Sequence, residues 1–220
     1  MSASGERSQP PPSGDVPKAV VNRLSLYLRE LQRLLRDGAR TTSSTQLGTL
    51  LGLTDAQVRK DLAYFGQFGH PGIGYHCDEL VREIKQILGT DRSWPVALVG
   101  VGNLGRALLG HRGFNQQGFQ MVAAFDVDPT KVGRKIMSIP VYHLDELPKV
   151  VAEKGIRLGI IAVPAPEAQE AADRLVTAGV DGVLNFAAVT LNLPKHVSTQ
   201  GVDLAMELEQ LAFAVANRRD

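Results

Sequence analysis

The chain has 220 residues, of which 44% are hydrophobic and 21% are charged, a composition typical of a globular protein with room for two modest domains. It contains no apolar run long enough to cross a bilayer, and its N-terminus lacks the pattern of a secretory signal, so we expect a cytoplasmic location and no membrane partner. The only cysteine, Cys77, excludes an intramolecular disulfide and provides no basis for a thiolate metal site, so no metal is expected.

The net charge of +1 hides an uneven distribution of charge along the chain. Between Lys18 and Cys77, eight Lys or Arg residues stand against four Asp or Glu residues, and the rest of the chain offsets this surplus. A local positive surplus of this kind favours a polyanion such as nucleic acid as the partner.

The first predicted element follows a low-complexity tail. Residues 1–16 are rich in Ser, Gly and Pro and have almost nothing apolar to bury, which predicts a disordered tail. From Pro17 onward, apolar residues recur at three- and four-residue steps, which predicts an amphipathic helix that ends near Gly38. Pro17 suits the first turn of this helix.

Two short helices are predicted next, with the spacing of a helix-turn-helix. Polar residues at Thr41–Thr45 provide N-cap candidates for the first, and Gly52 closes it. Thr54 caps the second, which turns its apolar residues inward and would enter the major groove of DNA. The glycine-rich stretch Gly66–Tyr75 predicts a tight β-hairpin, which would form a wing.

Residues 17–77 are therefore predicted to form a winged helix-turn-helix domain that binds double-stranded DNA. Arg59 is the candidate for reading a base edge through two hydrogen bonds, and Lys60 is the candidate for contacting a base or a phosphate. The other predicted DNA-binding residues are the backbone contacts Ser43, Ser44 and Thr45, the outward Tyr64, and His70 at the wing tip, which would reach the minor groove. The alternatives are that Arg59 and Lys60 form a solvated charged face, or that the domain only dimerises.

A connecting helix and linker are predicted over residues 78–93, with the helix at Asp78–Leu88 and the linker running toward Pro95. Residues 94–203 then alternate between buried strands and helices, which predicts a doubly wound parallel sheet of the Rossmann type. The strands are predicted at Val96–Val99, Met121–Phe125, Leu158–Val163 and Val180–Asn185. The helices are predicted near Leu104–His111, Leu144–Glu153 and Pro166–Ala178. Residues 204–220 are predicted as a C-terminal dimerisation segment, in which an amphipathic helix runs from Leu204 to about Ala216 with a stripe of Leu204, Leu208, Leu211 and Val215.

A dinucleotide fingerprint follows the first of these strands and opens a helix. It consists of Gly100, Val101, Gly102, Asn103, Leu104 and Gly105. Gly100 allows the tight turn, Gly102 allows a pyrophosphate to approach the backbone, and Gly105 allows the helix to pack closely on the strand. The phosphates would face the N–H groups at the start of the helix. The alternative is a tight turn that binds no ligand.

An acidic residue stands at the end of the second strand, about where this fingerprint requires one. Asp126 would accept the ribose hydroxyls of NAD and would repel the 2′-phosphate of NADP, although the nearby Arg134 could weaken that preference. Two further pairs at strand ends are candidates for the nicotinamide pocket, with loop packing as the alternative: Val163 with Pro164, and Asn185 with Phe186. Of the histidines, only His111 is placed near the cofactor, and helix capping is its alternative role.

A sensor of the nucleotide is favoured over an enzyme. The residues after the fingerprint are needed to complete the sheet and the last helix, which leaves no room for a catalytic domain. The histidines show no acid–base or metal-ligand spacing. The alternatives are a small NAD-dependent oxidoreductase with an accessory helical domain, and a nucleotide-binding scaffold that only dimerises.

From about Pro17 to its C-terminus, the sequence resembles the Rex family of bacterial redox-sensing transcriptional repressors. The resemblance rests on Arg23–Tyr27, Val58–Leu62, Tyr64–Gly66, Gly72–Tyr75, Val99–Gly105, Ala124–Asp126, Leu184–Phe186 and Val202–Leu204. It implies a homodimer whose terminal helices exchange between subunits and pack between the partner's two domains. It also implies binding to a palindromic operator, and release when NADH replaces NAD.

The resemblance further implies an interdomain switch formed by Arg23 and Asp203, which match positions that contact each other in the family. Capping of the last helix is the alternative role of Asp203. Relatives often carry a basic residue in the wing where this chain has Gln67 and His70, which puts phosphate binding by the wing in doubt.

Overall fold

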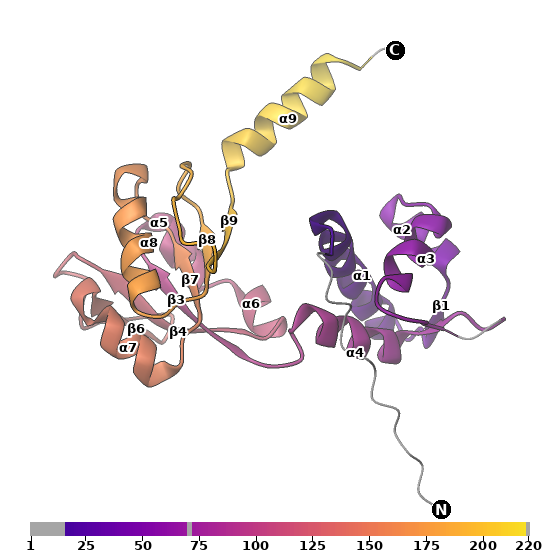
Figure 1. Cartoon of the computed structure of the whole chain (residues 1–220), viewed down its shortest axis with the longest axis horizontal. Coiled ribbons are helices and arrows are strands. Elements are labelled where there is room, and N and C mark those ends of the chain that lie inside the picture. The colour runs from indigo at the N-terminus through magenta and orange to yellow at the C-terminus, as the bar shows by residue number, and fades with distance from the viewer. Residues whose placement is uncertain (1–15, 70–71, 219–220) are drawn as a thin grey trace, which may run out of the picture. The chain divides into compact units, whose positions relative to one another are not determined.

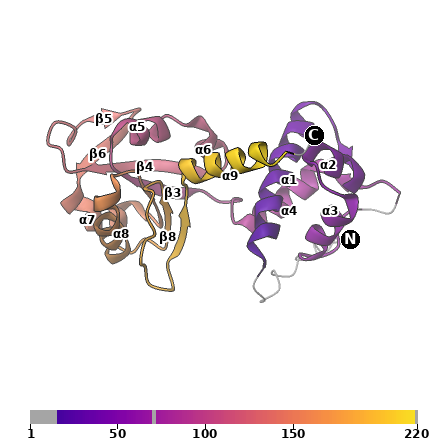
Figure 2. The same ribbon diagram turned by 90° about the horizontal axis from the view of Figure 1, so that it is seen from above.

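The structure is a computed structural model that describes residues 16–69 and 72–218. The chain divides into two compact units between Arg92 and Ser93, and the elements of each are shown from two directions in Figures 1 and 2. The predicted tail, apart from Val16, and His70 of the predicted wing tip lie outside the described residues.

Helices form the core of the N-terminal unit. They are α1 (Lys18–Arg36), α2 (Ser44–Leu51), α3 (Asp55–Ala63) and α4 (Cys77–Leu88). Buried apolar residues from all of them meet in one cluster, which includes Leu24, Leu31, Leu47, Val58, Leu62, Leu80 and Ile84. Because α4 contributes to this core, the segment predicted as a connecting helix belongs to the N-terminal unit.

The helix-turn-helix forms as predicted, with both predicted caps. Ser43 Oγ accepts a hydrogen bond from the N–H of Gln46 at 3.0 Å, and Thr54 Oγ1 accepts one from the N–H of Gln57 at 3.1 Å. The turn between the helices is tight, because a Cβ atom added to Gly48 would lie 2.6 Å from the carbonyl oxygen of Leu53. α2 and α3 therefore hold a close, fixed geometry.

The wing differs from the prediction in its pairing. Strand β2 (Tyr75–His76) pairs antiparallel with β1 (Thr41–Thr42), which lies just before α2. Within the glycine-rich stretch the chain does fold back, because a Cβ atom on Gly69 would lie 2.7 Å from the carbonyl oxygen of Gly74. The sequence did not indicate β1 as a partner, since a two-residue strand has no alternating pattern.

A seven-stranded sheet forms the second unit, in the order β5-β6-β4-β3-β7-β8-β9. The strands are β3 (Trp94–Val99), β4 (Phe119–Asp126), β5 (Lys135–Ile136), β6 (Ile139–His143), β7 (Leu158–Ile161), β8 (Gly182–Asn185) and β9 (Ser198–Gly201). All neighbours are parallel except β5 and β6. Counted from β3 without β5, this is the 3-2-1-4-5-6 order of the dinucleotide-binding fold, so the predicted sheet is confirmed. Trp94 and Pro95 belong to β3 rather than to the predicted linker.

Helices cover both faces of this sheet. On one face α5 (Asn103–Leu109) and α6 (Arg112–Gln116) share a core with Val96 and Ile160. On the other face α7 (Leu147–Lys154) and α8 (Ala168–Thr177) pack on the alternate residues Val99 and Ile161. Short 3-10 helices at Leu144–Glu146 and Ala165–Glu167 lead into α7 and α8.

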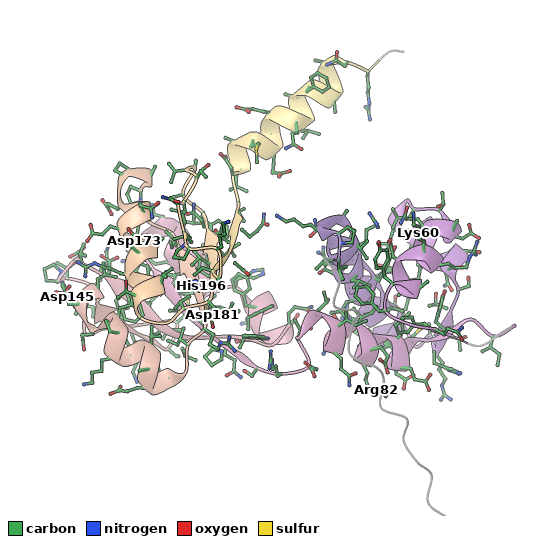
Figure 3. The ribbon with its side chains drawn as sticks, viewed as in Figure 1. Lys60, Arg82, Asp145, Asp173, Asp181 and His196 are labelled. Atoms are coloured by element: carbon green, nitrogen blue, oxygen red, sulfur yellow. The ribbon has the colours of Figure 1, made fainter. Side chains whose placement is uncertain are left out.

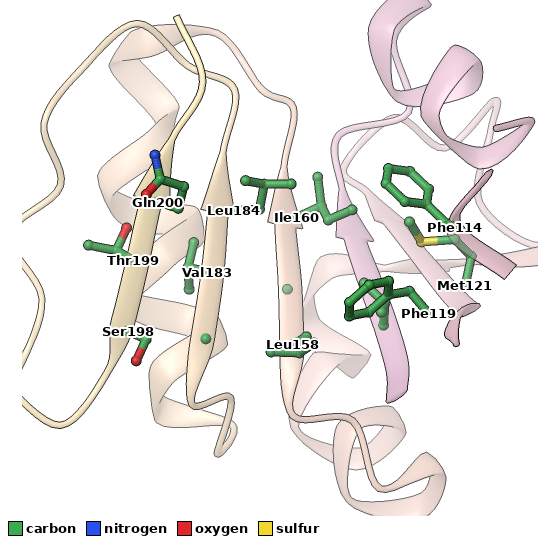
Figure 4. A pocket seen from close by; sticks show the side chains of 13 residues that line it. Phe114, Phe119, Met121, Leu158, Ile160, Val183, Leu184, Ser198, Thr199 and Gln200 are labelled. Atoms are coloured by element: carbon green, nitrogen blue, oxygen red, sulfur yellow. The ribbon is translucent and has the colours of Figure 1, made fainter. Parts of the chain in front are cut away.

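The face of the sheet that carries α5 and α6 also bears an apolar cavity of about 310 Å³. Side chains from neighbouring strands line it, among them Leu158, Ile160 and Leu184, and Phe114 and Phe119 lie at one side (Figure 4). This part of the sheet is therefore apolar as well as partly open.

The last helix, α9 (Leu204–Ala216), is exposed along its whole length. The predicted stripe is present, but Met206 and Phe213 are also apolar and are 49% and 71% exposed. An apolar surface this wide is unusual for a helix that faces water, which favours a covering partner. None of the helices among the described residues has the length and apolar character to span a bilayer.

Candidate nucleotide cleft and DNA-binding surface

A cleft of about 770 Å³ opens where the strands β3, β4, β6 and β7 end. It lies at the switch in strand order between β3 and β7, where open parallel sheets bind ligands. Five of the predicted residues line it: Gly100, Gly102, Asp126, Val163 and Pro164. The structure thus brings together the core of the predicted nucleotide site from separate strands.

Two of the fingerprint glycines, Gly100 and Gly105, have the steric roles predicted for them. Gly100 has a φ of +95°, and a Cβ atom on it would lie 2.6 Å from the carbonyl oxygen of Ala162. A Cβ atom on Gly105 would overlap the carbonyl oxygen of Gly100, so only glycine permits this approach of α5 to β3. Gly102 differs, because nothing lies within 4 Å of the position that its Cβ would occupy. The backbone at Gly102 therefore faces open space beside the cleft.

Asp126 ties the end of β4 to the glycine turn. Its Oδ2 accepts a hydrogen bond from the N–H of Val101 at 2.8 Å, and its Oδ1 accepts one from the N–H of Asp128 at 2.9 Å. Burial disfavours the ionised carboxylate, but these hydrogen bonds and a nearby ammonium outweigh it and hold the pKa of Asp126 below its usual value. The cleft therefore contains a fixed negative charge.

The ammonium belongs to Lys131, which sequence reasoning missed. Its Nζ lies 3.0 Å from Oδ2 of Asp126 and 3.5 Å from Oδ2 of Asp128. The hydrogen bond to Asp126 raises the pKa of Lys131 despite its partial burial. The sequence indicated Arg134 instead. Which cation reaches Asp126 depends on how the loop after β4 folds back, and the sequence does not show this.

The rim of the cleft carries further ion pairs. Arg174 of α8 lies 2.8 Å from Asp145, which Figure 3 labels, and 3.1 Å from Glu170. His143, at the end of β6, also lines the cleft. No cluster of His, Cys, Asp and Glu suited to a metal ion is found among residues 16–69 and 72–218.

Several predicted cofactor residues lie elsewhere or have other partners. Val101 is buried and its N–H is taken by Asp126. Asn103 and Leu104 are exposed at the start of α5. The amide of Asn185 binds its own loop, accepting from the N–H of Ala187 and donating to the carbonyl of Val189, both at 2.9 Å.

Phe186 and His111 pack against apolar neighbours. Phe186 lies against the core beneath α5 and α6. His111 precedes α6 and meets the ring of Phe114 edge-on at 4.8 Å. Neither residue lines the cleft at the strand ends.

In the N-terminal unit, the predicted DNA-binding residues gather on α2 and α3. Arg59 donates to Oδ2 of Asp55 at 2.7 Å and to Oγ of Ser44 at 3.2 Å. Thr45, Lys60 and Tyr64 are exposed, and Lys60 is labelled on α3 in Figure 3. Ser43 accepts the capping N–H and still has its hydroxyl proton to donate. Arg59 of α3 therefore lies beside Ser44 of α2, and the same two helices carry further exposed hydroxyl and cationic groups.

The same unit contains a buried carboxylate, Asp61, for which the sequence indicated no role of its own. The Asp61 side chain is 1% exposed and pairs with Arg23, whose Nε and Nη2 lie 2.5 Å and 2.8 Å from its two oxygens. Tyr27 donates its hydroxyl to the same carboxylate at 2.7 Å. Asp61 lies three residues after Val58 and one before Leu62, so the helical period already placed it on the inward face.

The two residues of the predicted switch have separate partners in this structure. Arg23 pairs with Asp61, and Asp203 caps α9 by accepting from the N–H groups of Ala205 and Met206 at 2.9 Å and 3.2 Å. The alternative role of Asp203 as an N-cap is confirmed. A contact between Arg23 and Asp203 stays a prediction.

Comparison with known proteins identifies the family. Residues 15–63 match a family model described as a putative DNA-binding protein N-terminus, and residues 91–189 match one described as a CoA binding domain. The chain is 48% identical to the redox-sensing transcriptional repressor Rex of Pelotomaculum thermopropionicum, over 92% of this chain and 95% of that protein. The chain belongs to the Rex family. Rex of Streptomyces coelicolor is 45% identical over 91% of this chain and 78% of its own length.

Solved structures of a Rex-family repressor, RSP, match both units. RSP in complex with β-NAD+ and operator DNA has a TM-score of 0.87 and 34% identity, with 92% of this chain and 94% of that chain covered. RSP in complex with β-NADH has a TM-score of 0.83 and 33% identity, covering 92% and 95%. These matches confirm the predicted family and the fold of this Rex-family chain.

The glycines of the cleft provide a matched pair of variants. Gly102→Ala should fold normally, because its methyl group enters open space, yet weaken NADH binding by at least about tenfold by blocking approach to the backbone. Gly105→Ala should instead lower the free energy of unfolding by about 1–3 kcal/mol, because its methyl group overlaps backbone. Calorimetric titration with NADH and urea denaturation measure the two effects. Unchanged NADH affinity in Gly102→Ala would count against the predicted site.

The buried carboxylate leads to a prediction about acid stability. Burial would raise the pKa of Asp61, but hydrogen bonds from Arg23, Tyr27 and Gln57 lower it below its usual value. Its contribution to stability is therefore complete above about pH 4 and is lost as the pH falls toward the folded-state pKa. Asp61→Asn should lower the free energy of unfolding by about 3 kcal/mol at pH 7 and by less below pH 4.

Urea denaturation of the parent and Asp61→Asn across this pH range measures the difference. The exposed Asp37→Asn is the control, with an expected change of at most about 1 kcal/mol. A deficit in Asp61→Asn that stays constant down to pH 2 would show that the ionised pair does not carry the stability.

Proposed function

We propose that this chain is a transcriptional repressor that binds a palindromic operator as a homodimer and is released when NADH replaces NAD. One observation carries the proposal: the cleft formed by Gly100, Gly102 and Asp126 occurs in a chain that matches RSP with bound β-NAD+ and operator DNA over 92% of its length. A repressor acts where operator DNA lies, so the cytoplasmic location expected from the sequence is part of this proposal.

The residues of the cleft fit a dinucleotide. The open space at Gly102 admits a pyrophosphate, with Asn103 and Leu104 next to it at the start of α5. The Asp126 carboxylate retains acceptor capacity for a ribose hydroxyl beside its existing bonds. Val163 and Pro164 offer an apolar wall for the nicotinamide ring. When bound, the cofactor would provide a ring whose two redox forms differ by one hydride and one unit of charge.

NAD is favoured over CoA despite the description of the matching family model. Both molecules contain adenosine diphosphate, but CoA carries an additional phosphate on its ribose. That phosphate would approach the fixed negative charge of Asp126, as would the 2′-phosphate of NADPH. Lys131 already balances Asp126 through a direct ion pair, which limits how far it can compensate a second anion.

We infer that the chain does not turn over a substrate. The relatives are named as repressors, and the charged groups of the cleft are engaged with one another rather than held free for proton transfer. An oxidoreductase is the alternative. Sustained NADH consumption with a carbonyl substrate would favour that alternative.

Contact with DNA is proposed through α2 and α3. Ser43, Ser44 and Thr45 would bind backbone phosphates, and Arg59, Lys60 and Tyr64 would face the major groove. His70 would reach the minor groove from the wing. Arg59 has to exchange its bond with Asp55 for one with a base, which is feasible because both side chains are about half exposed.

The proposed switch joins Arg23 to Asp203 in one of the two nucleotide states. A guanidinium has five N–H donors, and Asp61 engages Nε and Nη2, so Arg23 can bind a second carboxylate without leaving the first. Asp203 can still accept a hydrogen bond through Oδ2 while it caps α9, because both capping bonds use Oδ1. An exposed contact of this kind would contribute little, whereas a buried one would bias an equilibrium between two states.

The central test is operator affinity as a function of nucleotide. An operator is first selected from random duplexes with the NAD-loaded protein and is labelled with a fluorophore. The protein is then titrated into this duplex at fixed salt, with each nucleotide present in turn, and the fluorescence anisotropy is measured. NADH should weaken binding by at least about tenfold relative to NAD. NADPH and CoA at the same concentration should have little effect. Equal affinity with NAD and NADH would contradict the proposed function.

Exposed α9 provides the test of the homodimer. Phe213→Glu places a charge on the apolar surface and should shift sedimentation from dimer toward monomer at equal concentration. Glu209→Gln on the same helix is the control and should leave the dimer unchanged. A dimer of unaltered strength in Phe213→Glu would show that the subunits associate through another surface.

A further inference from the structure

The buried carboxylate of Asp61 connects two helices through a saturated set of hydrogen bonds. From α1 it receives Arg23 Nε and Tyr27 Oη on Oδ2, and Arg23 Nη2 on Oδ1. From α3 it receives Gln57 Nε2 on Oδ1 at 2.7 Å. A carboxylate offers about four acceptor positions, so these four donors occupy all of them. No donor can shift without disturbing the others.

Two of the donors share one oxygen. Arg23 Nη2 and Gln57 Nε2 both bind Oδ1, at 2.8 Å and 2.7 Å. A change in the position of the guanidinium therefore alters the bond that holds the Gln57 amide. Inside a protein such networks are stronger and more interdependent than the same groups in water.

Gln57 has the position and chemistry of a base-reading residue. It is the third residue of α3 and is half-buried, and the first residues of a recognition helix are those that contact base edges. Asp61 uses one of its amide hydrogens, which leaves one N–H and the carbonyl oxygen. That pair matches the acceptor and donor on the major-groove edge of adenine.

We propose that Asp61 is a positioning residue that couples Arg23 to Gln57, so that the contact of Gln57 with an adenine depends on the nucleotide state of the chain. The coupling rests on the proposed function, because it requires that NADH changes the environment of Arg23. Any pull on the guanidinium by a second carboxylate would be transmitted through Oδ1 to the Gln57 amide. The groove-reading helix would then respond within its own unit.

Gln57→Met tests this coupling without removing the buried ion pair. The measured quantity is the ratio of operator Kd with NADH to operator Kd with NAD, by anisotropy of the labelled duplex. Loss of a DNA contact that is equal in both states leaves this ratio unchanged. Coupling predicts that the ratio falls by at least about threefold.

Lys60→Met is the matched control on the same helix, because Lys60 is exposed and not bonded to Asp61. It should weaken operator binding with both nucleotides and keep the ratio. Arg23→Lys retains the charge but loses the shared bond on Oδ1, so it should also lower the ratio. Adding Gln57→Met to Arg23→Lys should then have no further effect on the ratio, as expected for two residues in one network.

The outcomes separate this inference from the function on which it rests. A parent chain that binds the operator equally with both nucleotides contradicts the proposed function. A parent that responds to NADH, together with a Gln57→Met variant that keeps the full response, contradicts the coupling alone. The coupling would also be overturned if Arg23→Lys and Gln57→Met lowered the Kd ratio independently, so that their fold-changes multiplied in the double variant. Circular dichroism of each variant verifies that the fold is retained.

Discussion

A carboxylate buried without hydrogen-bond partners would be strongly destabilising, and this constraint organises both units of the chain. Asp126 satisfies it with the backbone of the glycine turn and with Lys131, and so connects β4 to the loop after β3. Asp61 satisfies it with Arg23, Tyr27 and Gln57, and so connects α1 to α3. In each case the proposed ligand-binding surface lies directly beside the acid.

This arrangement explains why the nucleotide cleft can be both rigid and polar. Without Asp126, the buried N–H of Val101 would have no hydrogen-bond acceptor from β4. The glycine turn would then lose the bond that attaches it to the end of β4. Because the turn is held from within, a dinucleotide would need to order little of the protein when it binds, which favours affinity. If the cleft binds the nucleotide as proposed, the charge of Asp126 would contribute to selectivity between nucleotides.

The sequence was sufficient where a residue's role depends on neighbours close in the chain. Continuous apolar runs predicted β3, β4, β7 and β8, and the motif spacing placed Gly100, Gly102 and Asp126 in one cleft. It was insufficient where pairing is distant or an element is short and polar, as in β1, β5, α6 and β9. Lys131 depends on how its loop folds, and Asn185 proved to serve its own loop. Asp61 was accessible to helical periodicity, because it lies three residues after Val58 and one before Leu62.

In the part of the chain that the structure describes, the helix α9 lacks the packing partner that a helix with so many apolar residues needs. An isolated helix of this length is marginal in water, and most helical stability in proteins comes from packing of an apolar face. α9 has apolar residues on more than one side, all exposed, so its own packing within the described residues cannot stabilise it. In the proposed homodimer, a surface that binds α9 would supply this stability and would link the folding of α9 to association.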